Sequence, residues 1–199
     1  GCTPSDPIDA RVDPAIASSP KLTADVATIR NQGYRFESGK AGGGTFTLGL
    51  RIVVDPNDLA DPVEFSRALA HEVGHALDGP AKYRNDPSFD RQTYIDINTR
   101  IDLEGEAHAT IEELEVRDDV MTNNPGQDPG ITGATAAEKV AAWAEFQAGR
   151  IDRATLVDRL VNMFATGEQP SDDPTAKNYW DLYARLNAED WDRAHPPAP

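Results

Sequence analysis

Apolar side chains recur at helical spacing between residues 61 and 80. Five of them fall on one face of a helix with 3.6 residues per turn: Phe65, Leu69, Val73, Ala76 and Leu77. Asp61 and Pro62 precede this run and are typical of a helix N-terminus, whereas Gly79 and Pro80 follow it and are typical of a helix end. The pattern therefore predicts a capped helix that begins at residue 62 and ends near residue 78.

The same reasoning predicts further helices on both sides of this one. Their expected ranges are Lys21–Asn31, Thr99–Val120, Ala136–Ala148, Arg153–Thr166 and Thr175–Arg193. One buried face of the second range is marked by Leu103, Ala107, Ile111 and Leu114. Residues 122–134 contain two Pro-Gly pairs, and we interpret them as a surface loop or a lid.

Two stretches before the capped helix favour β-strands, namely Tyr34–Ser38 and Thr45–Val54. The glycine-rich segment 40–44 separates them, so we predict a β-hairpin. A glycine run also occurs in phosphate-binding loops, but those continue with Lys, then Ser or Thr, and into a helix. Here a predicted strand follows instead, which favours the turn.

These elements predict an α+β fold. A small antiparallel sheet would pack on the helix 62–78 and on the helix 99–120, and a helical C-terminal part would complete the fold. Residues 1–20 are rich in Pro, Asp and Ser and are predicted to be a leader or linker. Residues 21–199 would form one domain, with a core at 21–121 and the helical part at 135–199.

The charge balance excludes some classes of partner. The chain has 34 acidic and 19 basic residues and a formal net charge of -15, which disfavours binding to nucleic acid or to anionic lipid. No apolar run approaches the roughly 20 residues of a membrane-spanning helix. Cys2 is the only cysteine, so an internal disulfide framework is excluded.

The predicted helix 62–78 carries the sequence His71-Glu72-Val73-Gly74-His75, an HExxH pattern. Residues four apart on a helix are offset by only about 40°, so both imidazoles can face one metal ion. Glu72 lies beside them and can accept a proton from a water molecule on that ion. We therefore predict that His71 and His75 bind Zn²⁺ and that Glu72 is the general base.

A catalytic zinc ion held by two histidines needs a third protein ligand and one open position. Asp78 lies on the same helix, where a closed set of three ligands would be strained. Glu104, Glu106 and His108 on the helix 99–120 are better placed. Glu104 and Glu106 are offset by about 200°, so only one of them can face the metal. His108 shares the face of Glu104 and would either orient a ligand or be a partly buried histidine with a polar neighbour.

An HExxH helix followed by a separate helix with Glu-x-x-Ala, here Glu104 to Ala107, resembles the gluzincin metallopeptidases such as thermolysin. The resemblance covers residues 61–112 and implies a zinc endopeptidase in which Glu104, rather than Glu106, is the third ligand. The residue four positions later is His108, where the family has Asp or Asn. The resemblance also implies that Thr45–Val54 pairs with an extended protein or peptide substrate, although this segment could equally lie inside the sheet.

Peptide hydrolysis also needs a donor to the oxyanion, and Tyr179, Tyr183 and His195 are the candidates. The compact plan resembles metallopeptidase domains of bacterial secreted toxins and effectors, which implies secretion or delivery into a target cell and a cognate inhibitor or immunity protein. An ImmA-like cytoplasmic regulatory peptidase is one alternative. Another is a non-catalytic binding or structural domain in which a fourth protein ligand closes the zinc site.

Overall fold

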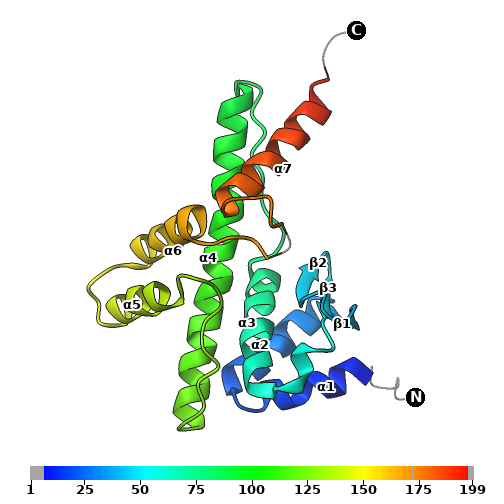
Figure 1. Ribbon diagram of the computed structural model, residues 1–199, viewed down its shortest axis with the longest axis vertical. Coiled ribbons are helices and arrows are strands. Elements are labelled where there is room, and N and C mark those ends of the chain that lie inside the picture. The colour runs from blue at the N-terminus through cyan, green and yellow to red at the C-terminus, as the bar shows by residue number, and fades with distance from the viewer. Residues whose placement is uncertain (1–6, 172, 197–199) are drawn as a thin grey trace. The chain divides into compact units, whose positions relative to one another are not determined.

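The computed structural model describes residues 7–171 and 173–196, which contain α-helices and a small sheet (Figure 1). The α-helices are α1 (Pro7–Ile16), α2 (Pro20–Asn31), α3 (Pro62–Asp78), α4 (Arg91–Asn123), α5 (Ala136–Gln147), α6 (Arg153–Gly167) and α7 (Tyr179–Ala194). The strands are β1 (Arg35–Ser38), β2 (Phe46–Leu48) and β3 (Arg51–Val54), and η1 (Asp58–Ala60) is a short 3-10 helix. This content confirms the α+β class with a helical C-terminal part.

The residues fall into two compact units, each built from two segments of the chain. One unit comprises Gly1–Pro80 and His108–Thr132, and the other comprises Ala81–Ala107 and Gly133–Pro199. The long helix α4 passes from the second unit into the first. Within the described ranges, every helix is too short or too polar to cross a lipid bilayer.

The sheet of the first unit is mixed rather than antiparallel, and the predicted hairpin between residues 34–38 and 45–54 is wrong. Gly49 has a φ of 58°, which suits the first central position of a tight hairpin turn. The segment 45–54 therefore folds back on itself, and β2 pairs antiparallel with β3 from Leu48↔Arg51. β1 pairs with the other edge of β3 in parallel, in the register Arg35↔Arg51. The order β1-β3-β2 leaves both β1 and β2 as edge strands.

The core of the first unit includes residues that the sequence placed in a leader. Residues 7–16 form α1, and Val12 and Ala15 on it are 0% and 1% exposed. They join a cluster with apolar residues of α2, β1, β3, α3 and the end of α4. Their burial corrects the expectation of a linker for this stretch, whereas residues 1–6 lie outside the described ranges. The two prolines of α1, Pro7 and Pro14, are typical of a linker and concealed its buried apolar face.

Helix α3 has the ends that its sequence predicts. Asp61 accepts hydrogen bonds from the amides of Val63 (2.9 Å) and Glu64 (3.2 Å), and Pro62 follows at the first helical position. Gly79 ends the helix with a φ of 76°, and its amide donates to the carbonyl of His75. Both signals are local to the chain, which is why they are visible in the sequence.

The glycine-rich segment connects β1 to β2 and closes on a buried carboxylate. Asp55 accepts hydrogen bonds from the amides of Gly42 (3.1 Å), Gly44 (2.9 Å) and Asn57 (2.9 Å). The Asn57 amide and the glycine amides hold the pKa of Asp55 below its usual value, although its desolvation acts in the opposite direction. These amides are thus engaged by an internal anion, in agreement with a structural turn rather than a phosphate-binding loop.

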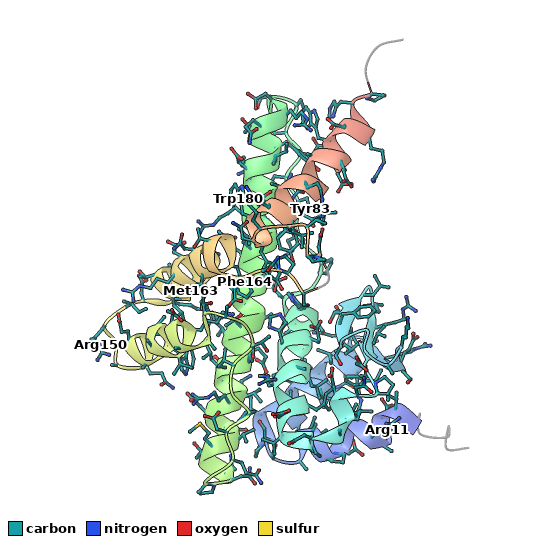
Figure 2. The ribbon with its side chains drawn as sticks, viewed as in Figure 1. Arg11, Tyr83, Arg150, Met163, Phe164 and Trp180 are labelled. Atoms are coloured by element: carbon teal, nitrogen blue, oxygen red, sulfur yellow. The ribbon has the colours of Figure 1, made fainter. Side chains whose placement is uncertain are left out.

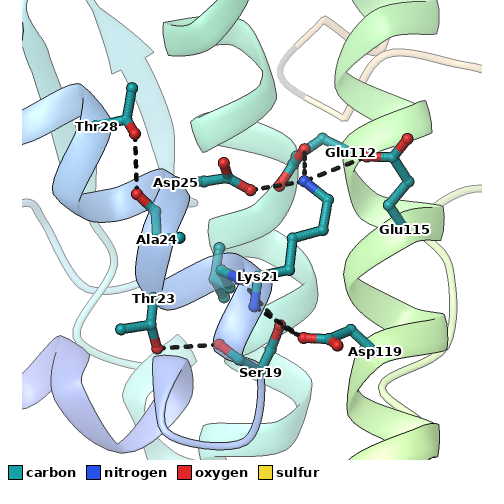
Figure 3. Close-up of polar contacts among 10 residues, drawn as sticks. Ser19, Lys21, Thr23, Ala24, Asp25, Thr28, Glu112, Glu115 and Asp119 are labelled. Carbon is teal, nitrogen blue, oxygen red and sulfur yellow. Dashed lines mark hydrogen bonds and ion pairs between the residues drawn. The ribbon is translucent and has the colours of Figure 1, made fainter.

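A cluster of charged residues joins α2 to α4 in the first unit (Figure 3). The Nζ of Lys21 lies 2.6 Å from Asp25, 2.7 Å from Glu112 and 3.2 Å from Glu115. Burial raises the pKa of Glu112 to about 7 in spite of the Lys21 ammonium, and Asp25 acts in the same direction as burial. The cluster fixes α2 against the part of α4 that follows residue 108.

The loop between α4 and α5 is held to the rest of the first unit by several polar contacts. Arg117 forms a two-pronged ion pair with Asp128, at 2.7 and 2.6 Å. Arg67 on α3 donates to the carbonyl of Pro129 (3.1 Å), and the amide of Thr132 donates to Glu113 on α4 (2.5 Å). These contacts favour the interpretation as a surface loop over that as a lid.

The second unit contains α5, α6, α7 and the first part of α4. It contains a buried ion pair between Lys139 on α5 and Glu168 after α6, at 2.8 Å. Glu168 also accepts hydrogen bonds from the amides of Ala134 (2.8 Å) and Thr135 (2.9 Å). The Lys139 ammonium lies 4.4 Å from the centre of the Phe164 ring, which is labelled on α6 in Figure 2. One anion therefore ties the start of α5 to the end of α6.

Candidate metal centre

The two histidines of the HExxH sequence lie one turn apart on α3. Their ring centroids are 4.9 Å apart, and the ring planes are nearly perpendicular at 82°. Both side chains are half-buried. The spacing and the capped helix thus place His71 and His75 side by side, as the sequence predicts.

One carboxylate joins these imidazoles. A ligand atom from each of His71, His75 and Glu106 lies within 4.8 Å of the other two. Glu106 is 7% exposed and lies on α4, two residues before His108, where the chain re-enters the first unit. Two imidazole nitrogens and one carboxylate form a donor set that suits a catalytic zinc ion. Among the described residues, this is the one group that meets the geometric requirement for a metal site.

The sequence favours Glu104 as the third ligand, but the structure groups Glu106 with the histidines. Glu104 forms an ion pair with Arg100 at 2.8 Å, and its side chain is 39% exposed. Positions 104 and 106 are about 200° apart on a helix. The rotation of α4 that buries Glu106 therefore also exposes Glu104. The Glu-x-x-Ala spacing that favoured Glu104 also occurs from Glu106 to Ala109, so the motif alone did not fix the helical phase.

Glu113 is a residue of the site that the sequence reasoning missed. Its Oε2 lies 3.3 Å from the Nδ1 of His71, and its Oε1 accepts the Thr132 amide at 2.5 Å. The Glu113 side chain is only 1% exposed. A buried carboxylate on Nδ1 orients an imidazole so that Nε2 faces a metal ion. The spacing between Glu106 and Glu113 is seven residues, which puts both on nearly the same face of α4.

Glu72 is held by the sheet. The hydroxyl of Thr47 on β2 donates to Glu72 Oε2 at 2.8 Å and also lies 3.1 Å from the Glu72 carbonyl oxygen. Glu72 is 9% exposed. The bond from Thr47 fixes the Glu72 carboxylate against β2, and Glu72 is the acceptor in this bond.

Gly74 allows α3 to approach the part of α4 that belongs to the first unit. A Cβ atom at this position would lie 2.7 Å from Ala109 Cα and 2.9 Å from Glu112 Cβ, both closer than ordinary contact. At Gly105 on α4, by contrast, a Cβ would meet nothing within 4 Å. The small residue that matters lies within the HExxH sequence itself.

The remaining candidate residues have other partners. His108 Nδ1 lies 3.1 Å from Asp78 Oδ1, so the two alternative ligands are neighbours of each other. His195 stacks on Trp191, with the ring centroids 3.8 Å apart. We therefore assign none of these three residues to the metal group.

The tyrosines considered as oxyanion donors lie on α7. The hydroxyl of Tyr183 donates to Glu106, whereas Tyr179 packs edge-on against Phe164 at 5.1 Å. Burial, followed by the Glu106 carboxylate, raises the pKa of Tyr183 well above its usual value of 10. The Tyr183 hydroxyl therefore stays protonated and acts as a donor to the candidate ligand.

Comparison with known proteins gave no relative. No family model matches the sequence, and no curated protein or solved structure is significantly similar to it.

Proposed function

We propose that the protein is a zinc-dependent metallopeptidase. The observation that carries this proposal is the group of His71, His75 and Glu106, whose ligand atoms lie within 4.8 Å of one another. Zinc bound there would lower the pKa of a coordinated water to about 7 and polarise a substrate carbonyl. Three protein ligands leave one position for that water, which distinguishes a catalytic from a structural site.

Each residue around the proposed zinc ion would then have a separate role in peptide hydrolysis. Glu72 accepts the proton of the attacking water and passes it to the departing amine. Thr47 keeps the Glu72 carboxylate in place through the bond at 2.8 Å, and Glu113 keeps the ring of His71 oriented through the contact at 3.3 Å. Both supporting groups reduce the freedom of a reacting or ligating side chain, which lowers the entropy cost of reaching the reactive geometry.

The edge strand β2 supports a polypeptide substrate. It has β3 as its neighbour on one side of the sheet, and edge strands bind extended peptides through main-chain hydrogen bonds. Thr47 connects β2 directly to Glu72, while the alternate residues Phe46 and Leu48 are 43% and 53% exposed. A peptide paired with β2 would thus run beside the general base.

The partners and the biological role of the protein are further proposals. The net charge of -15 disfavours nucleic acid as a substrate or partner. The peptidase could act as a secreted toxin or effector with a cognate inhibitor or immunity protein. It could instead act as an ImmA-like cytoplasmic peptidase, and both roles would use the same zinc-dependent peptide hydrolysis. The non-catalytic alternative is a zinc ion that only joins α3 to α4.

The decisive experiment compares wild type, Glu72→Gln and Glu64→Gln for zinc content and for cleavage of an unfolded protein. Glu64 lies on the same helix but is exposed, so it is a matched control. We expect each protein to bind one zinc ion, and Glu72→Gln alone to lose activity by about 10²–10⁴-fold, the usual contribution of a general base. Bound zinc without cleavage of any member of a broad peptide library would favour the structural alternative.

A further inference from the structure

The two edges of the sheet in the first unit differ in the side chains that they present. On β1, Phe36 is buried, and its neighbours Arg35 and Glu37 lie on the outer face of the sheet. Glu37 pairs there with Arg51 of β3 at 3.1 Å. Charged side chains on an edge strand oppose pairing with another chain, so the β1 edge is protected.

On β2, apolar residues occupy the outer face. Thr47 points to α3, where its hydroxyl bonds Glu72 at 2.8 Å, so its neighbours Phe46 and Leu48 face outward. They are 43% and 53% exposed, and Leu50 in the following turn is 57% exposed. No charged residue or proline interrupts β2, so this edge lacks the usual protection against pairing. Exposed apolar surface of this kind indicates a binding site.

The hydrogen-bond pattern puts the main chain of Thr47 at the open edge. In an antiparallel ladder, residues that bond across the pair alternate with residues whose amide and carbonyl point outward. Leu48 and Arg51 flank the two-residue turn and form a bonded pair. Phe46 and Val53, two positions further along, form the next one. Because Thr47 lies between these pairs, a peptide that extends the sheet would bond to Thr47.

We propose that Phe46 and Leu48 select the substrate, so that the peptidase cleaves extended segments with two large apolar side chains two residues apart. The inference rests on the proposed function. In an antiparallel pairing, which is the more stable kind, the peptide residue that bonds Thr47 directs its side chain to the α3 face. Its two neighbours then project beside Phe46 and Leu48. Apolar side chains there bury these two residues, whereas charged ones would lose hydration.

A peptide fits this edge better than a second copy of the chain does. β2 has three residues, whereas a stable dimer buries about 800 Å² on each partner. Two copies would each carry a net charge of -15 and repel each other. A substrate needs only a brief contact, and the bond from Thr47 to Glu72 places that contact next to the proposed general base.

The test maps the cleaved sites in a library of peptides from denatured proteins by mass spectrometry. We expect two apolar side chains, two residues apart, at a constant distance from the cut bond. Phe46→Thr and Leu48→Thr should each lower about 10-fold the ratio of kcat/KM for such a peptide to kcat/KM for a peptide with serine at the matching position. Leu50→Thr is the matched control, because Leu50 is similarly exposed but lies in the turn. This ratio does not depend on the folded fraction of a sample.

Leu48→Lys adds a readout that a purely structural role would not change, because we expect it to accept Asp or Glu at one of the two positions. Cleavage without the apolar pair, or the same preference in the wild type and both threonine variants, would overturn this inference and leave the peptidase function standing. A wild type that binds zinc but cleaves no peptide would refute both proposals. A wild-type dimer in sedimentation that Phe46→Thr dissociates would show instead that β2 binds a second copy.

Discussion

Replacing Gly74 with alanine tests whether the close approach of α3 and α4 holds the site together. The added Cβ would lie 2.7 Å from Ala109 Cα and 2.9 Å from Glu112 Cβ. Ordinary carbon–carbon contact begins near 3.5 Å, so the two helices must separate by about 1 Å. Both neighbouring atoms are close to the α4 backbone and cannot rotate away.

Two effects of this substitution oppose each other. Alanine favours a helix over glycine by about 1 kcal/mol, whereas overpacking of a tight core costs about 1–3 kcal/mol. We expect the steric cost to exceed the gain, so that the free energy of unfolding without zinc falls by about 1 kcal/mol. The separation would also lengthen the 3.3 Å contact between Glu113 and His71, and zinc affinity should fall by about 10-fold or more.

Urea unfolding in the presence of a chelator gives the stability, and chelator competition gives the zinc affinity. Gly105→Ala is the matched control, because it is also a helical glycine but a Cβ there meets nothing within 4 Å. The control should gain up to about 1 kcal/mol. If Gly74→Ala were stabilised as much as Gly105→Ala, or kept the zinc affinity of the wild type, the helix-contact argument would be refuted.

Three further predictions concern buried carboxylates. Glu113→Gln should weaken zinc binding by about 10–100-fold in a chelator competition, because a neutral amide orients His71 less strongly. Glu168→Gln should lower the free energy of urea unfolding by about 3–5 kcal/mol, because it leaves buried Lys139 without its anion. Since the pKa of folded Glu112 is raised to about 7, stability of the wild type should fall as pH rises from about 4.5 to 7, and Glu112→Gln should flatten that slope.

Each of these three predictions has an outcome that contradicts it. Unchanged zinc affinity of Glu113→Gln would mean that Glu113 does not orient the ligand. The exposed substitution Glu138→Gln on α5 is the control for Glu168→Gln, and an equal effect of both would deny the ion pair its structural role. A pH profile that is the same for wild type and Glu112→Gln would show that Glu112 does not titrate in this range.

The features that the sequence predicted well are those set by neighbouring residues. The bounds of α3 follow from Asp61, Pro62 and Gly79, whose effects reach no further than one helical turn. The spacing of His71 and His75 follows from the same helix. By contrast, α4 begins at Arg91 rather than Thr99, and Asp90 caps this start by accepting the amide of Thr93 at 2.7 Å. Asn98, which is 0% exposed, bonds the backbone of Arg84, and no hydrophobic pattern reports such a contact.

The sheet was harder to predict because its pairing depends on residues distant in the sequence. The periodicity of residues 45–54 fits one long strand as well as two short ones, and only the turn at Gly49 separates them. The parallel pairing of β1 with β3 follows from the burial of Phe36 and Ile52, which lie opposite each other and are 1% and 0% exposed. Register is decided by which face is buried, and that is a property of the folded unit.

The proposed third ligand, Glu106, depends on the helical phase of α4. The stretch from Glu104 to Ala109 contains Glu-x-x-Ala in two registers, so the motif is equally satisfied by residues on nearly opposite faces of α4. The choice is made by the packing of Leu103, Ala107 and Leu114, all 0% exposed, which fixes the rotation of α4 and leaves Glu104 beside Arg100 at the surface. Glu106 and Glu113 then face inward together. Seven residues after Glu106 the chain has a second carboxylate, Glu113, whereas seven residues after Glu104 it has Ile111. This spacing is therefore the sequence feature that distinguishes the two registers.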